Sequence, residues 1–343
     1  MKIPIANIYF LLLYAWDVLE EADLVDVAAD ESTEVLELFG RILNSGIRHA
    51  VRRGIRQDYL ARQEEIIGVR GRLLIDRTIR TESLQRGMTV CETDHLTPNT
   101  ATNQILRSTI RVLLQTPLLD ETLRAELLGI YRRLAGIDTL DISPALVRRV
   151  QLHRNPPFYR FLLSVCELII RQVAVGPEDK GVRFQGFDER ELLAEVFEQF
   201  LFNFYRREQR DFRVKREQIH WCPVSGRPED LELLPGMRTD VSLLSPSRHI
   251  IIDAKFYAET LTTRFEKKRI RENHLYQLFA YLSNARTAEE HSASVEGLLL
   301  YPQVEEAVSA KFEMHALPVR IETVDLTKST REIKERLLTL IAA

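Results

Sequence analysis

The sequence predicts a mixed α/β protein of two domains, and three observations support that prediction. The chain has 343 residues, of which 45% are hydrophobic and 28% are charged, so it is long enough for two domains of ordinary globular composition. Its C-terminal half alternates apolar runs typical of strands with segments of helical spacing. Residues 175–187 contain Gly, Pro and charges with little periodicity, as a linker does. We therefore expect domains over residues 1–178 and 179–343.

The N-terminal domain is expected to contain both helices and extended segments. One helix is predicted over about residues 7–21, and another from the cap "ESTE" near Ser32 to about residue 53. The stretch "DYLARQEEIIGVRGRLLIDRTI" predicts extended segments around a two-glycine break. Helical spacing returns from Thr100, and a further helix is predicted over about residues 158–173.

The C-terminal domain is expected to form a small mixed central sheet flanked by helices. A helix is predicted in "ERELLAEVFEQFLFNFYRRE", and extended pieces follow in "QIHWCP", "GMRTDVSLL" and "RHIIIDAKF". A second helix, "RENHLYQLFAYLSNA", precedes the extended pieces "VEGLLLYP" and "FEMHALPVRIETVDL" and a last helix over about residues 329–341. This order of helices and strands is typical of a sheet covered by helices.

Charge, cysteines and hydropathy limit the class of protein. The formal net charge of −3 gives no overall attraction to nucleic acid, so any such binding would depend on local patches. Cys91, Cys166 and Cys222 form no CxxC pair, which is typical of a reducing cytoplasm and predicts neither disulfides nor a zinc site. The apolar run Ile8–Trp16 is too short to span a bilayer and is closed by Asp17. We expect a cytoplasmic protein without membrane contact.

Charged residues end the apolar strand "RHIIIDAKF". Side chains alternate along a strand, so Asp253 and Lys255 share one face, about 6–7 Å apart along the chain. Asp240 lies on the preceding strand of a predicted hairpin and could meet them. Mg²⁺ prefers carboxylate oxygens, water and phosphate oxygens, and a neighbouring lysine can activate water and stabilise charge developing on phosphorus. The alternative interpretation is a surface salt bridge between Asp253 and Lys255.

Two neighbouring helices carry further candidates for the same site. Glu198 on the preceding helix would supply a third carboxylate, or is an ordinary solvated glutamate. Gln277 and Tyr281 on the following helix are spaced i,i+4 and share a face. That pair would contact the DNA backbone or support the site, and its alternative is routine amphipathic packing.

Three basic patches are candidates for contacts with DNA phosphates, which would make affinity fall with salt. In "TRFEKKRIRENH" we favour DNA contact, and the residues are Lys267, Lys268, Arg269 and Arg271. In "FYRREQRDFRVKRE" we favour a solvated face with paired acids. "RHAVRRGIRQ" would face DNA, a partner or water. The histidines show no metal-ligand spacing, and the chain lacks a Walker-type glycine loop, so we expect it not to bind nucleotide by that route.

The ordered motifs resemble those of the PD-(D/E)xK nuclease superfamily, in the branch with a Gln-x-x-x-Tyr helix. They are "MRT" before Asp240, then "IIIDAK", then "YQLFAY". Further stretches resemble the McrC family, the nuclease subunits of the McrBC modification-dependent restriction system, nearly from end to end. These stretches are "IPIANIYFLLLYAWD", "GVRGRLLIDRTIR", "IYRRLAGIDTL", "LLPGMRTDV", "HLYQLFAYL" and "GLLLYP".

This resemblance implies a partner and a division of labour between the domains. The partner would be McrB, a AAA+ GTPase ring that recognises double-stranded DNA containing methylated cytosine. Residues 1–178 would dock on the ring and stimulate GTP hydrolysis, with GTP bound by the partner and not by this chain. Residues 179–343 would be a restriction-endonuclease-like domain that cuts after GTP-driven translocation.

The resemblance also implies roles for individual residues. Asp240 and Asp253 would ligate Mg²⁺, with Mn²⁺ as a substitute, and the Ala254 carbonyl would be a further ligand. Lys255 would orient or activate the attacking water. Gln277, Tyr281 and Glu198 would belong to the same catalytic site. The family pattern has Pro before the first aspartate, where this chain has Thr239.

The sequence therefore predicts a Mg²⁺-dependent DNA endonuclease that works with a AAA+ GTPase. Two other functions remain open at this point. One is a non-catalytic activator of the ring, in which Asp253 and Lys255 form only a salt bridge. The other is a DNA-repair nuclease of the same superfamily that acts without a GTPase.

Overall fold

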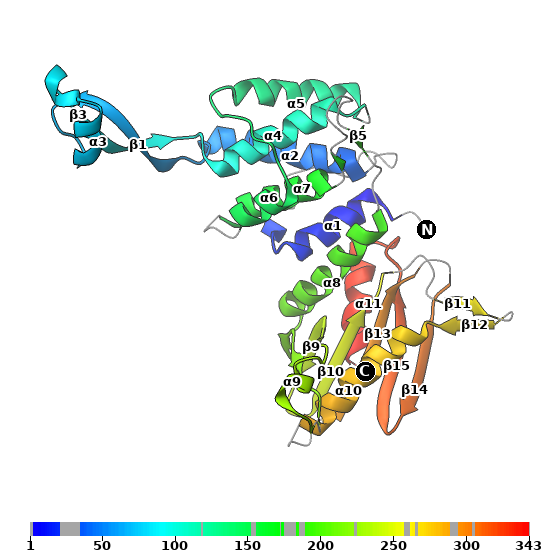
Figure 1. Ribbon diagram of the computed structural model, residues 1–343. Coiled ribbons are helices and arrows are strands. Elements are labelled where there is room, and N and C mark those ends of the chain that lie inside the picture. Colours follow the sequence, from blue (N-terminus) through cyan, green and yellow to red (C-terminus); the bar gives the residue numbers. More distant parts are fainter. Residues whose placement is uncertain are drawn as a thin grey trace. The chain divides into compact units, whose positions relative to one another are not determined.

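Figure 1 shows the computed structural model, which divides into two compact units. Unit 1 comprises Met1–Leu38 and Phe187–Ala343, and unit 2 comprises Phe39–Gly186. The structure describes the following residues: 3–20, 35–117, 119–151, 156–171, 173–174, 183–184, 189–222, 225–256, 261–264, 267–288, 294–303 and 306–342. The expected helix cap near Ser32 lies outside the described residues.

This division differs from the expected domains 1–178 and 179–343. The boundary before Phe187 falls at the end of the predicted linker, but the first 38 residues group with the C-terminal unit. The reason is helix α1 (Ile5–Ala15), whose residues are almost all buried. An apolar helix with no polar face must be covered on every side. Its cover comes from α8 (Glu189–Glu208), where the Phe10 and Phe200 rings meet edge to face with centroids 5.6 Å apart.

Unit 1 contains a six-stranded sheet in the order β14-β15-β13-β10-β9-β6. Strand β10 pairs in parallel with β13, and β13 with β15, while the other neighbours pair antiparallel. The strands are β6 (Arg213–Lys215), β9 (Val241–Leu244), β10 (Arg248–Ala254), β13 (Ser294–Pro302), β14 (Ser309–Met314) and β15 (Leu317–Val324). Two small ladders join β7 (Gln218–Ile219) to β8 (Met237–Arg238) and β11 (Leu261–Arg264) to β12 (Lys267–Ile270).

Helices cover both faces of this sheet. Because side chains alternate along β15, Val319 and Ile321 join the apolar cluster of α10 (Glu272–Ala288), while Arg320 turns to the opposite face. There its guanidinium donates to the Leu340 carbonyl near the end of α11 (Thr330–Ala342), at 2.8 Å. A short helix, α9 (Pro228–Leu231), precedes β8. The prediction of a mixed sheet flanked by helices is confirmed.

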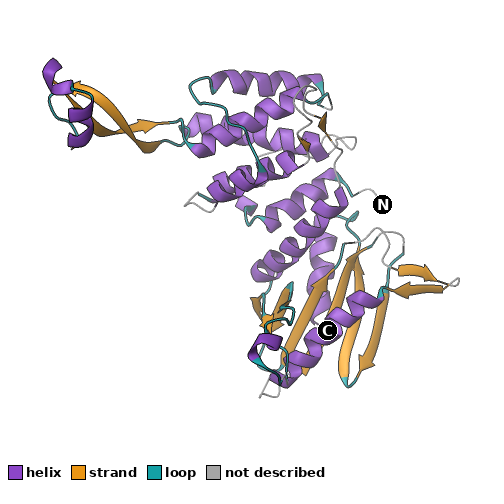
Figure 2. Ribbon diagram, viewed as in Figure 1, coloured by secondary structure: helices purple, strands orange, loops and turns teal. Residues whose placement is uncertain are grey.

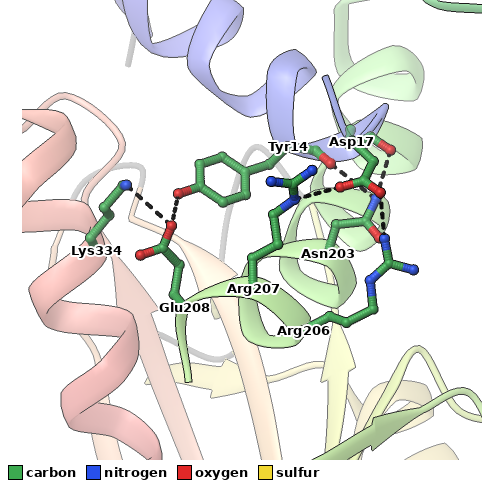
Figure 3. A network of polar contacts seen from close by, with 8 residues as sticks. Tyr14, Asp17, Asn203, Arg206, Arg207, Glu208 and Lys334 are labelled. Carbon is green, nitrogen blue, oxygen red and sulfur yellow. Dashed lines mark hydrogen bonds and ion pairs between the residues drawn. The ribbon is translucent and has the colours of Figure 1, made fainter. Parts of the chain in front are cut away.

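Figure 3 shows how α1 is fixed to α8 and α11 by polar contacts. The Asn203 amide donates to the Tyr14 and Ala15 carbonyls, each at 2.9 Å, and so satisfies carbonyls at the end of α1. Tyr14 donates to the Glu208 carboxylate, which Lys334 of α11 also contacts at 3.3 Å. These buried and half-buried bonds fix the position of α8, the helix that carries Glu198.

Unit 2 consists of helices and a separate three-stranded sheet in the order β1-β3-β2. The helices are α2 (Val35–Arg53, which begins in unit 1), α4 (Ala101–Gln115), α5 (Glu121–Arg133), α6 (Pro144–Gln151) and α7 (Pro157–Arg171). The strands are β1 (Asp58–Ile67), β2 (Arg72–Leu73) and β3 (Met88–Thr97), and β4 (Val173–Ala174) pairs with β5 (Arg183–Phe184). The segment from β1 to β3, residues 58–97, is called the arm below (Figure 2).

The arm contains helical turns where the sequence predicted only extended chain. Residues "IDRTIR" form α3 (Ile75–Arg80), and a 3₁₀ turn, η2 (Ser83–Arg86), follows. The buried Thr78 hydroxyl explains why the chain turns here: it donates to the Leu74 carbonyl and accepts from the Val90 N–H, both at 2.9 Å. These bonds tie α3 to β3.

Three hydrogen bonds hold the base of the arm to the helices of unit 2. The fully buried Asn103 of α4 donates to the carbonyls of Arg56 and Pro98, one on each side of the arm, at 2.8 and 2.7 Å. The Tyr159 hydroxyl of α7 accepts from the Arg56 N–H at 2.9 Å. Both ends of the arm are therefore fixed. Among the described helices of the whole chain, none has the length and apolar character needed to cross a membrane.

Candidate active site

Strand β10 places Asp253 in the interior of unit 1. It lies between β9 and β13, and Ile250, Ile251, Ile252 and Asp253 are all fully buried. The ladder with β13 continues past Ala254, because the Lys255 N–H donates to the Leu300 carbonyl at 3.0 Å. The backbone on both sides of the Asp253 side chain is therefore fixed.

Asp240 meets the end of β10, as the predicted hairpin required. Its Oδ2 accepts a hydrogen bond from the Ala254 N–H at 2.8 Å. The predicted strand "GMRTDVSLL" is interrupted at Thr239 and Asp240, which lie between β8 and β9. Because the strand is interrupted there, Asp240 is not part of the ladder, and its carboxylate can reach the Ala254 N–H.

Thr239 occupies the position where the resembled family pattern has proline. Its hydroxyl is buried, accepts from the Glu217 N–H at 2.9 Å and lies 2.9 Å from the Ser242 hydroxyl. The Thr239 N–H donates in turn to the Glu217 carbonyl at 3.0 Å. A proline would lack that N–H. Here the bend before Asp240 is therefore held by hydrogen bonds.

Asp253 and Lys255 form a buried ion pair. The Lys255 Nζ donates to the Asp253 carboxylate at 3.0 Å, and the two side chains are 15% and 1% exposed. The alternative of a surface salt bridge is therefore wrong for this pair. A buried charge is costly unless it is compensated, so burial at this depth is unusual for a pair that serves stability alone.

The electrostatics of the site bring Glu198 into it. The pKa of Glu198 is raised to about 7, first by burial and then by the Asp240 charge, against the opposing effects of Lys255 and Arg216. Burial likewise raises the pKa of Asp253 to about 7 against the effect of Lys255, with Asp240 and Glu198 adding to the rise. Burial also raises the pKa of Asp240. Three carboxylates in one low-dielectric region repel one another, as at many catalytic sites.

Lys255 stays protonated at this site. Burial lowers its pKa, but Asp253 first and then Asp240 and Glu198 outweigh burial, so the net shift is upward. A lysine ammonium has three donors and no acceptor. One donor is used by Asp253, so the ammonium can also bind a second oxygen, such as that of water or phosphate.

The carboxylate oxygens of the site suit a hard cation that completes its coordination shell with other oxygens. Among the described residues, no three His, Cys, Asp or Glu side chains are placed to hold a metal ion together. The buried Oδ2 of Asp253 accepts no hydrogen bond from the described residues, although Lys255 lies 3.0 Å away. A carboxylate oxygen of this kind, with Asp240 beside it, fits Mg²⁺, which usually keeps several waters or phosphate oxygens. The residues present therefore fit the predicted ion.

Helix α10 brings Tyr281 to the carboxylates and Gln277 to Tyr281. The Gln277 amide donates to the Tyr281 hydroxyl at 2.7 Å, and Tyr281 is buried. Burial raises the pKa of Tyr281, and the charges of Asp253 and Asp240 raise it further. The predicted pair is therefore formed, and its tyrosine lies within electrostatic reach of the site.

The predicted DNA-contact patch is only partly described. The side chains of Lys267, Lys268 and Arg269 lie outside the described residues, although β12 includes all three. Arg271 is half-buried and close enough to His274 to lower its pKa, together with burial and Lys255. The role of this patch in DNA binding stays a prediction.

Arg216 is a site residue that the sequence interpretation missed. It follows β6 in the patch interpreted as a solvated face, yet its Nε donates to the Asp240 carbonyl at 3.2 Å. Its Nη2 donates to the Gln199 amide oxygen of α8 at 2.9 Å. Residues in this short edge strand alternate, with Arg213 and Lys215 on one side and Val214 and Arg216 on the other. This alternation was the available signal, but it does not identify the neighbour of Arg216.

Residues 6–302 match the family described as McrBC 5-methylcytosine restriction system component. A protein of Escherichia coli (strain K12), the Type IV methyl-directed restriction enzyme EcoKMcrBC, is 33% identical over 337 residues, 98% of this chain and 96% of that protein. The chain belongs to the McrC family of McrBC restriction-system components. The resemblance stated from the sequence is thereby confirmed.

A solved structure supports the fold of this McrC-family chain. It is a half-complex from a tetradecameric assembly of Thermococcus gammatolerans McrB AAA+ hexamers with bound McrC. The likeness covers 98% of this chain and 76% of that chain, with a TM-score of 0.58 and 15% sequence identity. At that identity the likeness shows the fold alone.

Proposed function

We propose that this McrC-family chain is the Mg²⁺-dependent endonuclease subunit of a GTP-dependent restriction complex. The observation that carries the proposal is the buried Asp253–Lys255 ion pair, with Asp240 hydrogen-bonded to the next residue of the same strand. The 33% identity to a methyl-directed restriction enzyme supports a nuclease. The substrate proposed for this chain is double-stranded DNA that contains methylated cytosine.

The residues of the site have different roles in the proposed phosphodiester hydrolysis. Asp240, Asp253 and the Ala254 carbonyl would hold Mg²⁺, which when bound supplies Lewis-acid activation and neutralises phosphate charge. Lys255 donates to the attacking water and to the oxygen on which charge develops. Glu198, with its raised pKa, accepts the proton of that water in its ionised form. Tyr281, fixed by Gln277, closes the α10 side of the site.

The arm supports a partner role for unit 2. None of the ten residues of β1 is buried, and the arm exposes large apolar side chains along its length. They are Tyr59, Leu60, Ile67, Val69, Leu73, Ile75, Ile79, Leu84 and Leu96. Exposed apolar surface on this scale marks a protein interaction site. We propose that its occupant is a McrB-type AAA+ ring, since the solved relative is a complex of McrB hexamers with bound McrC, and that docking stimulates GTP hydrolysis.

Cleavage is the experiment that tests this function. The chain is mixed with a McrB-type AAA+ GTPase from the same organism, GTP, Mg²⁺ and plasmid with or without cytosine methylation, and Asp253→Ala runs in parallel. Cutting of methylated plasmid only, lost in the variant with GTP hydrolysis still stimulated, is the expected result. Stimulated GTP hydrolysis without cutting would favour a non-catalytic activator. Cutting of unmodified linear DNA without GTP would favour a repair nuclease.

A further inference from the structure

Arg216 joins two elements that carry site carboxylates. Its guanidinium binds the Asp240 carbonyl and the Gln199 amide, as described above, and lies over the Phe202 ring at 4.8 Å. Gln199 and Phe202 belong to α8, and Gln199 follows Glu198 directly. Arg216 is therefore a positioning residue that connects the Asp240 turn to the helix of Glu198.

The contacts of Arg216 leave several of its N–H donors available. A carbonyl, an amide and a ring are its partners, and it forms no ion pair with any described residue. The side chain is half-buried, so solvent and ligands can reach it. An arginine has five N–H donors in a planar fork. Only Nε and one Nη are used in these bonds, so the other donors remain for an anion.

A second arginine lies on the same side of the chain as Asp240. Met237 and Thr239 are buried, whereas Arg238 is exposed and Asp240 half-buried. Within the described part of the structure, the Arg238 side chain makes no hydrogen bond or ion pair. Arg238 pairs with Gln218 in the β7–β8 ladder, and the Thr239 N–H donates to the Glu217 carbonyl, so Arg238 and Arg216 lie on adjacent stretches of chain. The charge of Arg238 reaches Arg216 and adds to burial in lowering the Arg216 pKa. Two guanidiniums on adjacent stretches of chain beside the proposed active site can bind one anion together.

We propose that Arg216 and Arg238 form the phosphate-binding site that holds the DNA backbone next to Asp240 and Asp253. The proposal rests on the proposed function, and it names the chemistry of the ligand: a phosphodiester oxygen of the strand to be cut. Arginine forks bind phosphate oxygens bidentately, which fixes orientation as well as distance. The site is separate from the predicted patch at 267–271.

Arg216 and Arg238 have different roles in this site. Arg238 is exposed and has no other role, so it contributes mainly affinity for the DNA backbone. Arg216 also holds the Asp240 turn, so its loss would disturb the carboxylates as well as the phosphate. Arg238→Ala is therefore the clean test, and Arg216→Lys, which keeps the charge but loses the fork, is the second variant.

The first experiment measures binding of a fluorescent double-stranded oligonucleotide by the full chain alone, over a series of KCl concentrations without divalent ions. The slope of log affinity against log salt reports phosphate contacts. For Arg238→Ala we expect about tenfold weaker binding at low salt and a slope reduced by about one. Arg331→Ala, which removes an exposed arginine paired with Glu335 on α11, is the charge-matched control and should leave the slope unchanged.

The second experiment measures cleavage and GTP hydrolysis together, with the partner ring in excess. Arg238→Ala should slow cleavage about tenfold without changing GTP hydrolysis, and Arg238→Lys should recover part of the loss. Arg216→Lys should lower the cleavage rate at saturating DNA as well.

The outcomes separate the two proposals. If the wild type cleaves and Arg238→Ala matches Arg331→Ala in salt slope and cleavage rate, the phosphate site is overturned while the nuclease stands. If the wild type does not cleave, the nuclease fails and the binding slope alone decides the phosphate site. A wild type that neither binds DNA at low salt nor cleaves it overturns both.

Discussion

Strands β1 and β10 differ in the fraction of their residues that is buried. None of the ten residues of β1 is buried, whereas every residue of β10 after Arg248 is. The arm exposes apolar side chains to solvent, whereas the central sheet buries charged side chains. Exposed apolar surface and buried charge both have an unfavourable free energy when no ligand is bound. The first therefore suits the binding of another protein, and the second suits catalysis. The proposed function thus assigns partner recognition and catalysis to two different sheets.

Removing the buried charge should give the largest effect. Asp253→Ala deletes a proposed metal ligand and leaves Lys255 without its ion-pair partner. We expect cleavage to fall by at least roughly a thousandfold, as for removal of other catalytic groups, with stimulation of GTP hydrolysis unchanged. Plasmid cleavage and phosphate release are measured in one reaction. A parallel loss of GTPase stimulation in a folded variant would show that the two sheets are not independent.

Removing exposed apolar groups from the arm should have the converse effect. Ile67 is 87% exposed, and Ile67→Ser and Ile79→Ser together should weaken partner binding about 10–100-fold, because each loses apolar contact area in the proposed interface. Titration of the GTPase with the chain gives the affinity. A change in thermal stability would be unexpected for side chains this exposed. Leu233→Ser in unit 1, at an apolar residue that is 82% exposed, is the matched control.

The stability of the metal-free chain should depend on pH through Asp253. Its folded pKa of about 7 lies above the ordinary value of 3.8, so folding favours the protonated form. Stability is then fully present below about pH 4 and is lost as pH rises through about 7. Asp253→Asn should remove this loss and be more stable than the wild type at pH 8 by roughly 1–3 kcal/mol, with the difference vanishing near pH 4.

Denaturant unfolding at several pH values, in EDTA, measures that difference. Mg²⁺ should then stabilise the wild type at pH 8 and have less effect on Asp253→Asn, because a ligand that binds only the folded state adds to stability. A wild type whose stability rises from pH 5 to pH 8 relative to Asp253→Asn would contradict the assignment.

The base of the arm should show the smallest effect. Asn103→Ala leaves the Arg56 and Pro98 carbonyls without their buried donor, at a cost of about 1–2 kcal/mol. The midpoint of thermal unfolding should fall by several degrees, in contrast to the arm variants Ile67→Ser and Ile79→Ser. Equal stability of Asn103→Ala and wild type would mean that the arm is not fixed at its base by these bonds.

The sequence predicted the parts of the site that depend on local geometry. Alternation along one strand is enough to place Asp253 beside Lys255, and a hairpin is enough to bring Asp240 toward them. Glu198 and Arg216 could not be decided in the same way, because both approach the site from other elements. Their neighbours are set by tertiary packing, which a single sequence does not encode in any short pattern.

Two features of the fold were missed for specific physical reasons. The segment predicted as one extended piece, "FEMHALPVRIETVDL", is a hairpin that turns at His315 and Ala316, both with positive φ (51° and 60°). Neither is the Gly or Asn that usually marks such a turn. The apolar pattern of α1 predicted a buried helix correctly, but a helix that is apolar all round does not indicate which domain covers it.

The packing of α1 in unit 1 has a consequence for biosynthesis. Its cover, α8, begins at Glu189, and the bonds from α11 come only from the end of the chain. At about 5–20 residues per second, roughly ten to forty seconds separate the emergence of α1 from that of α8. Throughout that interval the side chains that will meet Phe200 and Phe204 lack their native partners on α8. The growing chain exposes these apolar side chains until then, and unit 1 can close only after unit 2 has been made.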